Sequence, residues 1–178
     1  MDLLKQMQKE YAGIKARPSK TQVDSSLCKG RAAHEKIVSV DIETMTTEQT
    51  LIVIKPDGFK RLLTGKILAR FEEKGLQLRN LKSYDFTKEK AQEFYSVHKG
   101  KPFFDELLSF IMSGTVVACI LEGSHAVNTV RLMIGSTKSF EAAPGTIRGD
   151  FGLGFTDNII HASDSPESFI KESRVIFG

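Results

Sequence analysis

Cysteine is scarce in this sequence, and long apolar runs are absent from it. Only two of the 178 residues are cysteines, Cys28 and Cys119, which is too few for a disulfide framework. Nothing in the chain resembles a paired Cys or His metal site. No apolar stretch approaches the roughly 20 residues that a membrane-spanning helix needs, and the N-terminus lacks the apolar core of a secretory signal. We therefore expect neither a disulfide-rich secreted domain nor a helical membrane protein.

The second cysteine indicates the redox compartment. Cys119 lies inside the apolar run 116–121, Val-Val-Ala-Cys-Ile-Leu, where a buried and reduced thiol is expected. Reduced thiols persist in reducing compartments. The sequence therefore favours a cytoplasmic protein.

A strong excess of one charge is also lacking. Lys and Arg number 25 against 22 Asp and Glu, and the excess is uneven. Residues 1–44 hold eight basic and six acidic residues, whereas residues 45–178 hold 17 and 16. A nearly neutral main body argues against bulk nucleic-acid binding, which relies on a broad basic surface. We expect no membrane and no specific nucleic acid among the partners.

The chain organises into one domain with an extension before it. A length of 178 residues and 40% hydrophobic composition suffice for one core. Residues 1–44 contain a weakly helical start, a Pro break and a polar stretch typical of a linker, so we expect a mostly flexible extension. A transit peptide is disfavoured because Asp2, Glu10 and Asp24 do not suit an acid-poor presequence. Residues 45–178 form the expected domain.

Strand and helix patterns alternate along residues 51–177. Strands are predicted over 51–54, 76–86, 115–121 and the apolar run that ends at His161. Helices are predicted over 62–74, 87–97, 103–113 and 166–177, with Thr87 as the cap of the second. One more helix, capped by Ser124, is expected to carry Arg131. Such alternation implies one sheet with helices packed on it. The loop 138–148 has no regular pattern.

The stretch 158–165, Asn-Ile-Ile-His-Ala-Ser-Asp-Ser, holds the strongest candidate for chemistry. Pro166 suits the first position of a helix, and Ser165 or Ser163 could cap it. His161 is therefore expected at the end of a buried strand, directly before a helix. An imidazole titrates near neutral pH and becomes a good nucleophile when one ring nitrogen is held by a partner. A lone histidine in such a place is more often a core residue, so the neighbouring motifs decide.

No Gly-x-x-x-x-Gly-Lys-Ser/Thr phosphate loop is present. A triphosphate site in this chain must therefore use side chains. Lys55 at a strand end, Arg131 on a helix and Arg148 after a Pro-Gly turn supply three cations from separate elements. Each of them alone would be read as a surface charge.

Several motifs together resemble a known family. Asn-x-x-His-x-Ser-Asp-Ser, preceded by Pro-Gly-Thr-Ile-Arg-Gly-Asp-Phe at 144–151, resembles the signature of nucleoside diphosphate kinases. Ile-Lys-Pro-Asp-Gly at 54–58 resembles the first motif of that family, and 79–84 and 101–104 fall where further counterparts lie. The match runs from about residue 50 to residue 177 without a gap in motif spacing. The resemblance implies a ferredoxin-like α+β sandwich with a four-stranded antiparallel sheet.

The resemblance also implies the reaction and its catalytic residues. The γ-phosphate of a nucleoside triphosphate would move to a nucleoside diphosphate by a ping-pong path through phosphorylated His161. Glu172 would hydrogen-bond the other ring nitrogen of the imidazole, and Lys55 would act at the phosphates. The alternative is a non-catalytic nucleotide-binding or scaffold member of the family, against which the intact set of these three residues argues.

Nucleotide binding is implied for a second group of residues. Lys55, Arg131, Thr137 and Arg148 would bind phosphates, and Asn158 with Lys55 would reach the ribose 3′-hydroxyl. Phe103 would stack on the base, in a slot lined by Leu107 and Phe155, and Tyr95 would support the phosphate end. Mg²⁺ would be held mainly through nucleotide phosphates, without a metal site built by the protein. His98 and His125 are expected at the surface.

Two further expectations concern geometry and assembly. Asn158 and His161 would point to opposite faces of a regular strand, so the strand must begin after Asn158 or the backbone must bend. The resemblance implies a homo-oligomer, with a hexamer favoured over a tetramer. Because the chain ends at Gly178, about one short segment before most members of the family end, we expect a weaker assembly.

Overall fold

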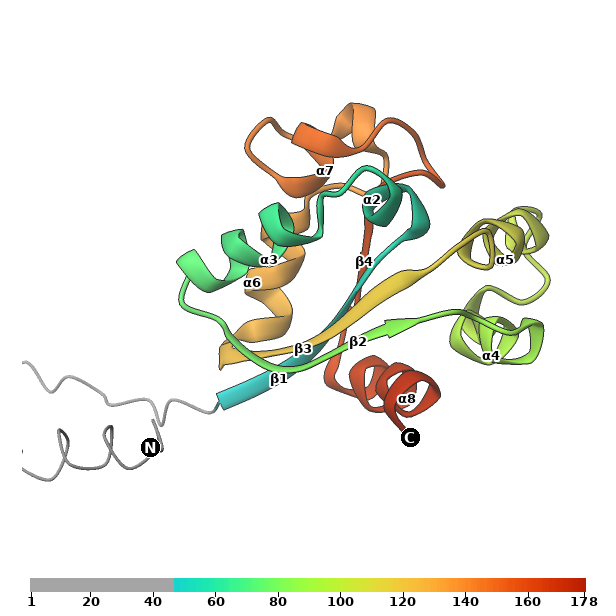
Figure 1. Cartoon of the computed structure of the whole chain (residues 1–178), viewed down its shortest axis with the longest axis horizontal. Helices are drawn as coiled ribbons and strands as arrows, with labels where there is room; N and C mark the ends of the chain where they lie inside the picture. The colour runs from blue at the N-terminus through green and yellow to red at the C-terminus, as the bar shows by residue number, and fades with distance from the viewer. Residues whose placement is uncertain (1–46) are drawn as a thin grey trace, which may run out of the picture. The chain divides into compact units, whose positions relative to one another are not determined.

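The computed structural model describes residues 47–178, so the expected extension 1–44 lies outside the described residues. At the centre is a four-stranded sheet in the order β2-β3-β1-β4 (Figure 1). Its strands are β1 (Thr47–Ile54), β2 (Gln77–Tyr84), β3 (Val116–Ser124) and β4 (Ile160–Ala162). Every neighbouring pair is antiparallel, which confirms the predicted antiparallel sheet.

Strand β1 is buried on both faces because its apolar run is continuous. Ile52 and Ile54 belong to one core cluster, whereas Leu51 and Val53 belong to a second cluster on the other face. All four side chains are fully buried. This is the pattern expected when consecutive residues of a strand point to opposite sides and helices cover both.

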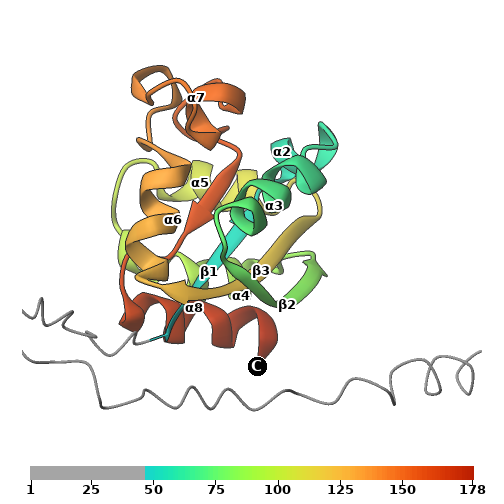
Figure 2. The same cartoon turned by 90° about the vertical axis from the view of Figure 1, so that its left-hand side faces the viewer.

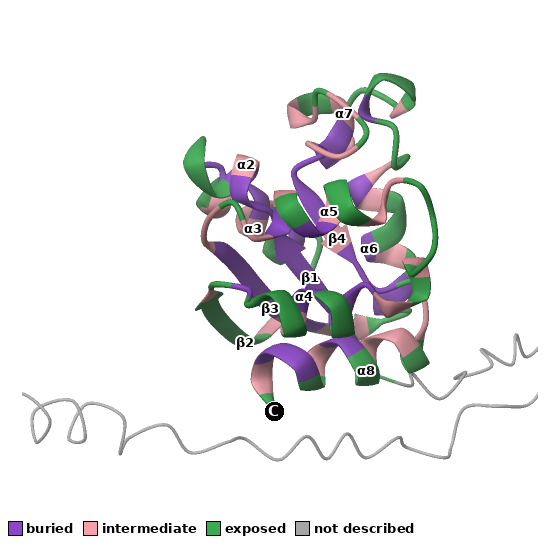
Figure 3. Ribbon diagram, turned by 90° about the vertical axis from the view of Figure 1, so that its right-hand side faces the viewer, coloured by how far each residue is buried: buried purple, intermediate pink, exposed green. Residues whose placement is uncertain are grey.

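Helices cover the two faces of the sheet (Figure 2). One face carries α3 (Thr64–Glu73) and α6 (Ala126–Ile134), which contribute to the cluster around Ile52. The other carries α4 (Lys88–Phe94), α5 (Phe104–Ile111) and α8 (Pro166–Phe177), which contribute to the cluster around Leu51. Burial is concentrated along β1, β3 and the inward sides of these helices (Figure 3). No helix within 47–178 is long and apolar enough to cross a membrane.

Short helical turns complete the connections. Helix α2 (Pro56–Lys60) is separated from the end of β1 by one residue, Lys55. The 3₁₀ turns η1 (Ser96–His98) and η2 (Ser139–Glu141) lie before α5 and after α6, and α7 (Ile147–Phe151) follows η2. The predicted irregular loop 138–148 therefore contains η2 and the start of α7.

The predicted helix caps are confirmed in two of three places. The side chain of Thr87 accepts the Lys90 N–H, and the side chain of Ser165 accepts the Ser168 N–H at 3.1 Å. The Ser124 cap was wrong, because pairing with Thr47 extends β3 through Ser124. A side chain from β1 serves α6 instead, since the Val127 N–H donates to the Glu48 carboxylate at 2.9 Å.

Candidate active site

A cavity of about 320 Å³ is lined by residues that lie far apart in the sequence. They come from the end of β1, the connection between α4 and α5, α6, the segment before β4, β4 itself and α8. The structure thus brings together every residue for which the sequence predicted a role in catalysis or nucleotide binding. These residues are Lys55, Phe103, Arg131, Thr137, Arg148, Asn158, His161 and Glu172.

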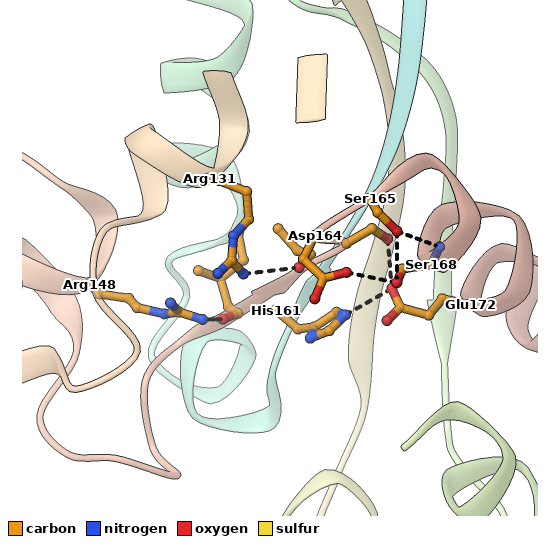
Figure 4. A network of polar contacts seen from close by, with 10 residues as sticks. Arg131, Arg148, His161, Asp164, Ser165, Ser168 and Glu172 are labelled. Carbon is orange, nitrogen blue, oxygen red and sulfur yellow. Dashed lines mark hydrogen bonds and ion pairs between the residues drawn. The ribbon is translucent and has the colours of Figure 1, made fainter. Parts of the chain in front are cut away.

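His161 is the middle residue of β4 and pairs with Val53 of β1. Its Nε2 lies 2.9 Å from Oε2 of Glu172, on the second turn of α8 (Figure 4). The same carboxylate oxygen accepts a hydrogen bond from the Ser163 hydroxyl at 2.6 Å. The rings of Phe94 and Tyr95 pack against the imidazole in T-shaped contacts, with ring centroids 5.1 and 6.1 Å away. The hydrogen bond to Glu172 and the packing of the two aromatic rings therefore hold the imidazole in place.

The contact with Glu172 decides which ring nitrogen is reactive. A carboxylate accepts hydrogen bonds, so the imidazole nitrogen facing it carries the proton. In the neutral ring the other nitrogen, Nδ1, then holds the free electron pair. His161 lines the cavity and keeps part of its side chain accessible, at 21% of full exposure. The arrangement is that of a nucleophile whose tautomer is set by a buried carboxylate.

A tight backbone turn lets Asn158 and His161 reach the same cavity. Strand β4 begins only at Ile160, and Ile159 has a φ of 70°, which is rare for a β-branched residue. The Ile160 N–H donates to the Asn158 carbonyl at 2.8 Å, forming a γ-turn around Ile159. Both alternatives expected from the sequence therefore hold, because the strand starts after Asn158 and the backbone bends there.

The turn at Ile159 is held by the segment that follows β1. The Ile159 N–H donates to Oδ2 of Asp57 at 3.0 Å, and its carbonyl accepts the Lys55 N–H at 2.8 Å. The Ile159 side chain is fully buried in the core. Because these contacts fix both backbone groups and the side chain, the surrounding structure sustains the unfavourable φ angle.

Lys55 is a buried cation at the end of β1. Its ammonium group donates to Oδ1 of Asn158 at 2.7 Å and to the Thr156 carbonyl at 3.1 Å. Burial lowers the pKa of Lys55 to about 8, and the positive charge of Arg148 adds to this effect. The carboxylates of Asp57 and Asp157 act in the opposite direction.

Asn158 organises the neighbouring loop as well as facing the cavity. Its amide nitrogen donates to the carbonyls of Thr137 and Phe155, at 2.9 and 2.7 Å. With Oδ1 accepting from Lys55, the amide thus joins three separate segments. A ligand hydroxyl at this place would therefore meet an oriented amide and an oriented ammonium group.

Two arginines add positive charge to the phosphate end. Arg148, on α7, is buried and donates to the carbonyls of Gly135 and Ile160 at 2.9 and 2.8 Å. Burial, followed by the charge of Arg131, lowers the pKa of Arg148 to about 10, which leaves the guanidinium charged at neutral pH. Arg131, on α6, is more exposed and lies 3.4 Å from the Ala162 carbonyl. Contacts with backbone carbonyls therefore orient both guanidinium groups.

Aromatic rings form the opposite wall. Phe103 lies directly before α5 and meets Phe155 edge to face, with ring centroids 6.0 Å apart. Leu107 lines the same part of the cavity. Tyr95 lies toward His161, and burial raises the pKa of its hydroxyl strongly. The cavity therefore has an apolar end at Phe103 and a cationic end near His161.

The structure adds residues that the sequence reasoning missed. His98, expected at the surface, is half-buried and lines the cavity, with its ring centroid 5.7 Å from that of Phe103. Asp164 also lines the cavity and accepts a hydrogen bond from Ser168 at 2.7 Å. Ser163, considered from the sequence only as a helix cap, instead donates its hydroxyl to Glu172.

Comparison with known proteins identifies the family. The family model described as nucleoside diphosphate kinase matches residues 48–178. A nucleoside diphosphate kinase from Staphylothermus marinus is 58% identical over 133 residues, covering 75% of this chain and 94% of the relative. One from Hyperthermus butylicus is 55% identical, with the same coverage of both chains.

Solved structures agree with the sequence relatives. The nucleoside diphosphate kinase of Aquifex aeolicus has a TM-score of 0.73 and 51% identity, covering 74% of this chain and 96% of that one. The halophilic enzyme from Halobacterium salinarum, solved in complex with CDP, has a TM-score of 0.71 and 44% identity, covering 73% and 87%. The ferredoxin-like fold predicted from the motifs is thereby confirmed. This chain belongs to the nucleoside diphosphate kinase family.

Proposed function

We propose that His161 is the residue through which this chain carries out the reaction of its family. That reaction moves the γ-phosphate of a nucleoside triphosphate to a nucleoside diphosphate through a phosphohistidine. One observation supports the assignment more than any other. The 2.9 Å contact between His161 Nε2 and Glu172 leaves Nδ1 of His161 with a free electron pair beside the cavity.

In the first half-reaction, each bond that forms is matched by one that breaks. Nδ1 of His161 attacks the γ-phosphorus, a phosphorus–nitrogen bond forms, and the bond from phosphorus to the β,γ-bridging oxygen breaks. The nucleoside diphosphate leaves with that electron pair. The imidazole gains positive charge during transfer, which the carboxylate of Glu172 stabilises through the proton on Nε2. In the second half-reaction an acceptor diphosphate oxygen attacks the phosphohistidine, and the ring returns to its neutral form.

The cations of the cavity fit the charge that moves in this reaction. Phosphoryl transfer depends mainly on positioning and on positive groups around the transferred phosphate. We assign phosphate binding to Lys55, Arg131, Arg148 and Thr137. The pKa of Lys55 of about 8 leaves most of the group charged at neutral pH, and a bound phosphate favours the charged form further.

The apolar end of the cavity suits a base held by its face. Phe103 offers a ring surface, and Leu107 and Phe155 lie beside it. Every nucleobase has an aromatic face, so stacking accepts purines and pyrimidines alike. We assign the ribose 3′-hydroxyl to Lys55 and Asn158, whose polar atoms are 2.7 Å apart.

A Mg²⁺ ion fits this site only as a companion of the nucleotide. Within residues 47–178 no group of three or more His, Cys, Asp or Glu side chains could hold a metal ion. Mg²⁺ often keeps several waters and binds through phosphates with one or two carboxylates. Asp164 is the cavity carboxylate available to such an ion, since Glu172 is engaged with His161 and Ser163. When bound, the ion would neutralise phosphate charge.

We also propose a homo-oligomer, with a hexamer favoured over a tetramer. Strand β2 lies at an edge of the sheet and is mostly exposed, so its backbone groups are open to pairing with a second copy. Phe140 and Leu153 are 71% and 73% exposed in the segment between α6 and β4. Large exposed apolar side chains of this kind are frequent in subunit contacts. Sedimentation velocity over a dilution series tests the assembly, and an active monomer at every concentration contradicts it.

A cytoplasmic location is proposed from the redox state. Cys119 is a buried free thiol in β3. Burial raises its pKa to about 12, which keeps it protonated and unreactive. A structural thiol of this kind is compatible with a reducing compartment.

Labelling with γ-labelled ATP tests the proposed role of His161. The protein should acquire a label that acid removes and base does not. His161→Ala should abolish both labelling and phosphoryl transfer. His125→Asn is the control, because His125 is exposed outside the cavity and its φ of 50° suits asparagine. Turnover that persists in His161→Ala contradicts the phosphohistidine path through this residue.

A further inference from the structure

The segment His98-Lys99-Gly100-Lys101 forms a turn that places its first and last residues side by side. Lys99 has φ −55° and ψ 130°, and Gly100 has φ 84°, which are the angles of a type II turn. The Lys101 N–H closes the turn by donating to the His98 carbonyl at 3.1 Å. Pro102 restricts Lys101 to extended backbone. The backbone turn itself therefore places His98 and Lys101 next to each other.

The contact between the His98 and Lys101 side chains determines which of the two groups donates the hydrogen bond. Nζ of Lys101 lies 3.2 Å from Nδ1 of His98, and the same ammonium lies 5.7 Å from the centroid of the Phe103 ring. An ammonium group donates hydrogen bonds and accepts none. Nδ1 of His98 must therefore be the acceptor. In the neutral ring the proton is then on Nε2.

His98 lies between the two ends of the cavity. Its ring centroid is 6.2 Å from that of Tyr95, toward His161, and 5.7 Å from that of Phe103. A nucleotide with its base on Phe103 and its terminal phosphate at His161 passes this position. In this placement of the nucleotide, the His98 ring lies beside its sugar–phosphate part.

Burial, together with nearby positive charges, lowers the pKa of His98 and so favours the neutral ring. Burial lowers the pKa of His98, and the charges of Lys101 on its own turn and of His161 on β4 lower it further. Glu172 on α8 and Asp164 before that helix oppose the shift without cancelling it. A protonated ring would also direct an N–H at the Lys101 ammonium. The contact geometry and the surrounding charges thus favour the same state.

We propose that Lys101 is a positioning residue that holds His98 in the neutral form with its proton on Nε2, as a hydrogen-bond donor to the bound nucleotide. The proposal rests on the proposed function for the placement of the nucleotide. Lys101 itself does not line the cavity, so it acts through His98. The donor then faces an oxygen of the ligand between the base and the terminal phosphate.

Two substitutions that remove the same charge separate this contact from a general charge effect. Lys101→Met removes the donor and keeps a long side chain. Lys99→Met removes an equal charge from an exposed residue of the same turn that does not contact His98 in the structure. Lys101→Arg keeps a donor. All are full-length variants, and NMR of the histidine rings, assigned with His98→Gln, reports both tautomer and pKa.

The expected spectra follow from the contact. In the natural protein neutral His98 carries its proton on Nε2, and its pKa lies below the ordinary range. Lys101→Met raises that pKa more than Lys99→Met does, and Lys101→Arg leaves it near the natural value. A proton on Nδ1 in the natural protein overturns the proposal. Equal pKa changes in the two methionine variants overturn it as well.

Kinetics test the consequence for the nucleotide. Lys101→Met should raise KM for ATP about two- to tenfold, the range for one hydrogen bond, while kcat changes little. In a His98→Ala background the same substitution should add nothing, because its effect passes through the imidazole. An equal increase of KM in both backgrounds overturns the positioning role. Labelling of the natural protein and its absence in His161→Ala test the proposed function separately, so loss of label from Lys101→Met alone would overturn only the positioning role.

Discussion

Nε2 of His161 and Oε2 of Glu172 lie 2.9 Å apart, and the Ser163 hydroxyl donates to the same oxygen at 2.6 Å. One carboxylate oxygen therefore accepts two hydrogen bonds in a largely buried place. In the proposed reaction this oxygen would orient the imidazole before transfer and balance the charge that the ring gains during transfer. The contact joins β4 to α8 at the ring nitrogen opposite the one proposed to react.

Replacing the carboxylate by an amide tests this relationship. Glu172→Gln should lower kcat by roughly 10- to 100-fold, because a hydrogen bond to a charged partner contributes about 1.5–3 kcal/mol. The amide nitrogen can also face the ring and reverse its tautomer. Ser163→Ala, which removes only the second bond to the same oxygen, should have a smaller effect. Steady-state kinetics decide this, and an unchanged kcat in Glu172→Gln contradicts the role of the charge.

The depressed pKa of Lys55 predicts an alkaline limit to activity. The proposed role of Lys55 in binding phosphate needs its charged form, which prevails below its pKa, so kcat/KM should fall as pH rises through about 8. The pH profile of kcat/KM reports the free enzyme, in which burial lowers this pKa. Lys55→Arg keeps the charge at higher pH and should move the decline upward, even where the rate itself is reduced. A profile in the natural protein that stays flat well above pH 8 excludes this assignment.

Phe103 should contribute similarly to the binding of every nucleotide. Phe103→Ala removes the ring that faces the apolar end of the cavity and should weaken binding by roughly 1–3 kcal/mol for each base. Phe59→Ala is a matched control, because Phe59 is an exposed aromatic residue that does not line the cavity. Calorimetry with ADP, GDP, CDP and UDP measures the losses. A loss confined to one base would reveal groups that read the base edge.

Asp57 should matter for stability as well as for activity. Asp57→Ala leaves the buried Ile159 N–H without its acceptor, which costs about 1–3 kcal/mol in unfolding free energy. The γ-turn at Ile159 also loses a contact, so kcat should fall with it. Asp57→Asn retains an acceptor oxygen and is the milder control. Denaturant unfolding and kinetics on the same samples test both effects, and equal stability of the alanine variant would contradict them.

Residues 1–44 should be dispensable for catalysis. Among residues 47–178, those that line the cavity lie between Lys55 and Glu172. A chain that starts at Met45 is therefore expected to retain the specific activity of the full chain. The two proteins are compared at equal concentration, with sedimentation velocity as a control for assembly. A large decrease in activity would show that the first 44 residues support the site or the oligomer.

Local sequence patterns were sufficient for much of the fold. The run 51–54 indicated a strand buried on both faces, because four consecutive apolar residues leave no solvent-facing side. Thr87 and Ser165 predicted helix starts because a side-chain oxygen there satisfies a free backbone N–H. The cap at Ser124 failed for a non-local reason. Pairing with β1 extends β3 through that residue, and Glu48 takes over the cap.

For the site, the residue types were readable from the sequence and their arrangement was not. The motifs around Lys55, Phe103, Arg148 and His161 predicted the chemistry, since each carries a functional group that the proposed reaction needs. Only the tertiary structure showed that Asp57 supports the bend at Ile159, that Ser163 shares an oxygen of Glu172, and that His98 lies in the cavity wall. Such contacts depend on which segments the sheet and its helices bring together, and no local pattern encodes that juxtaposition.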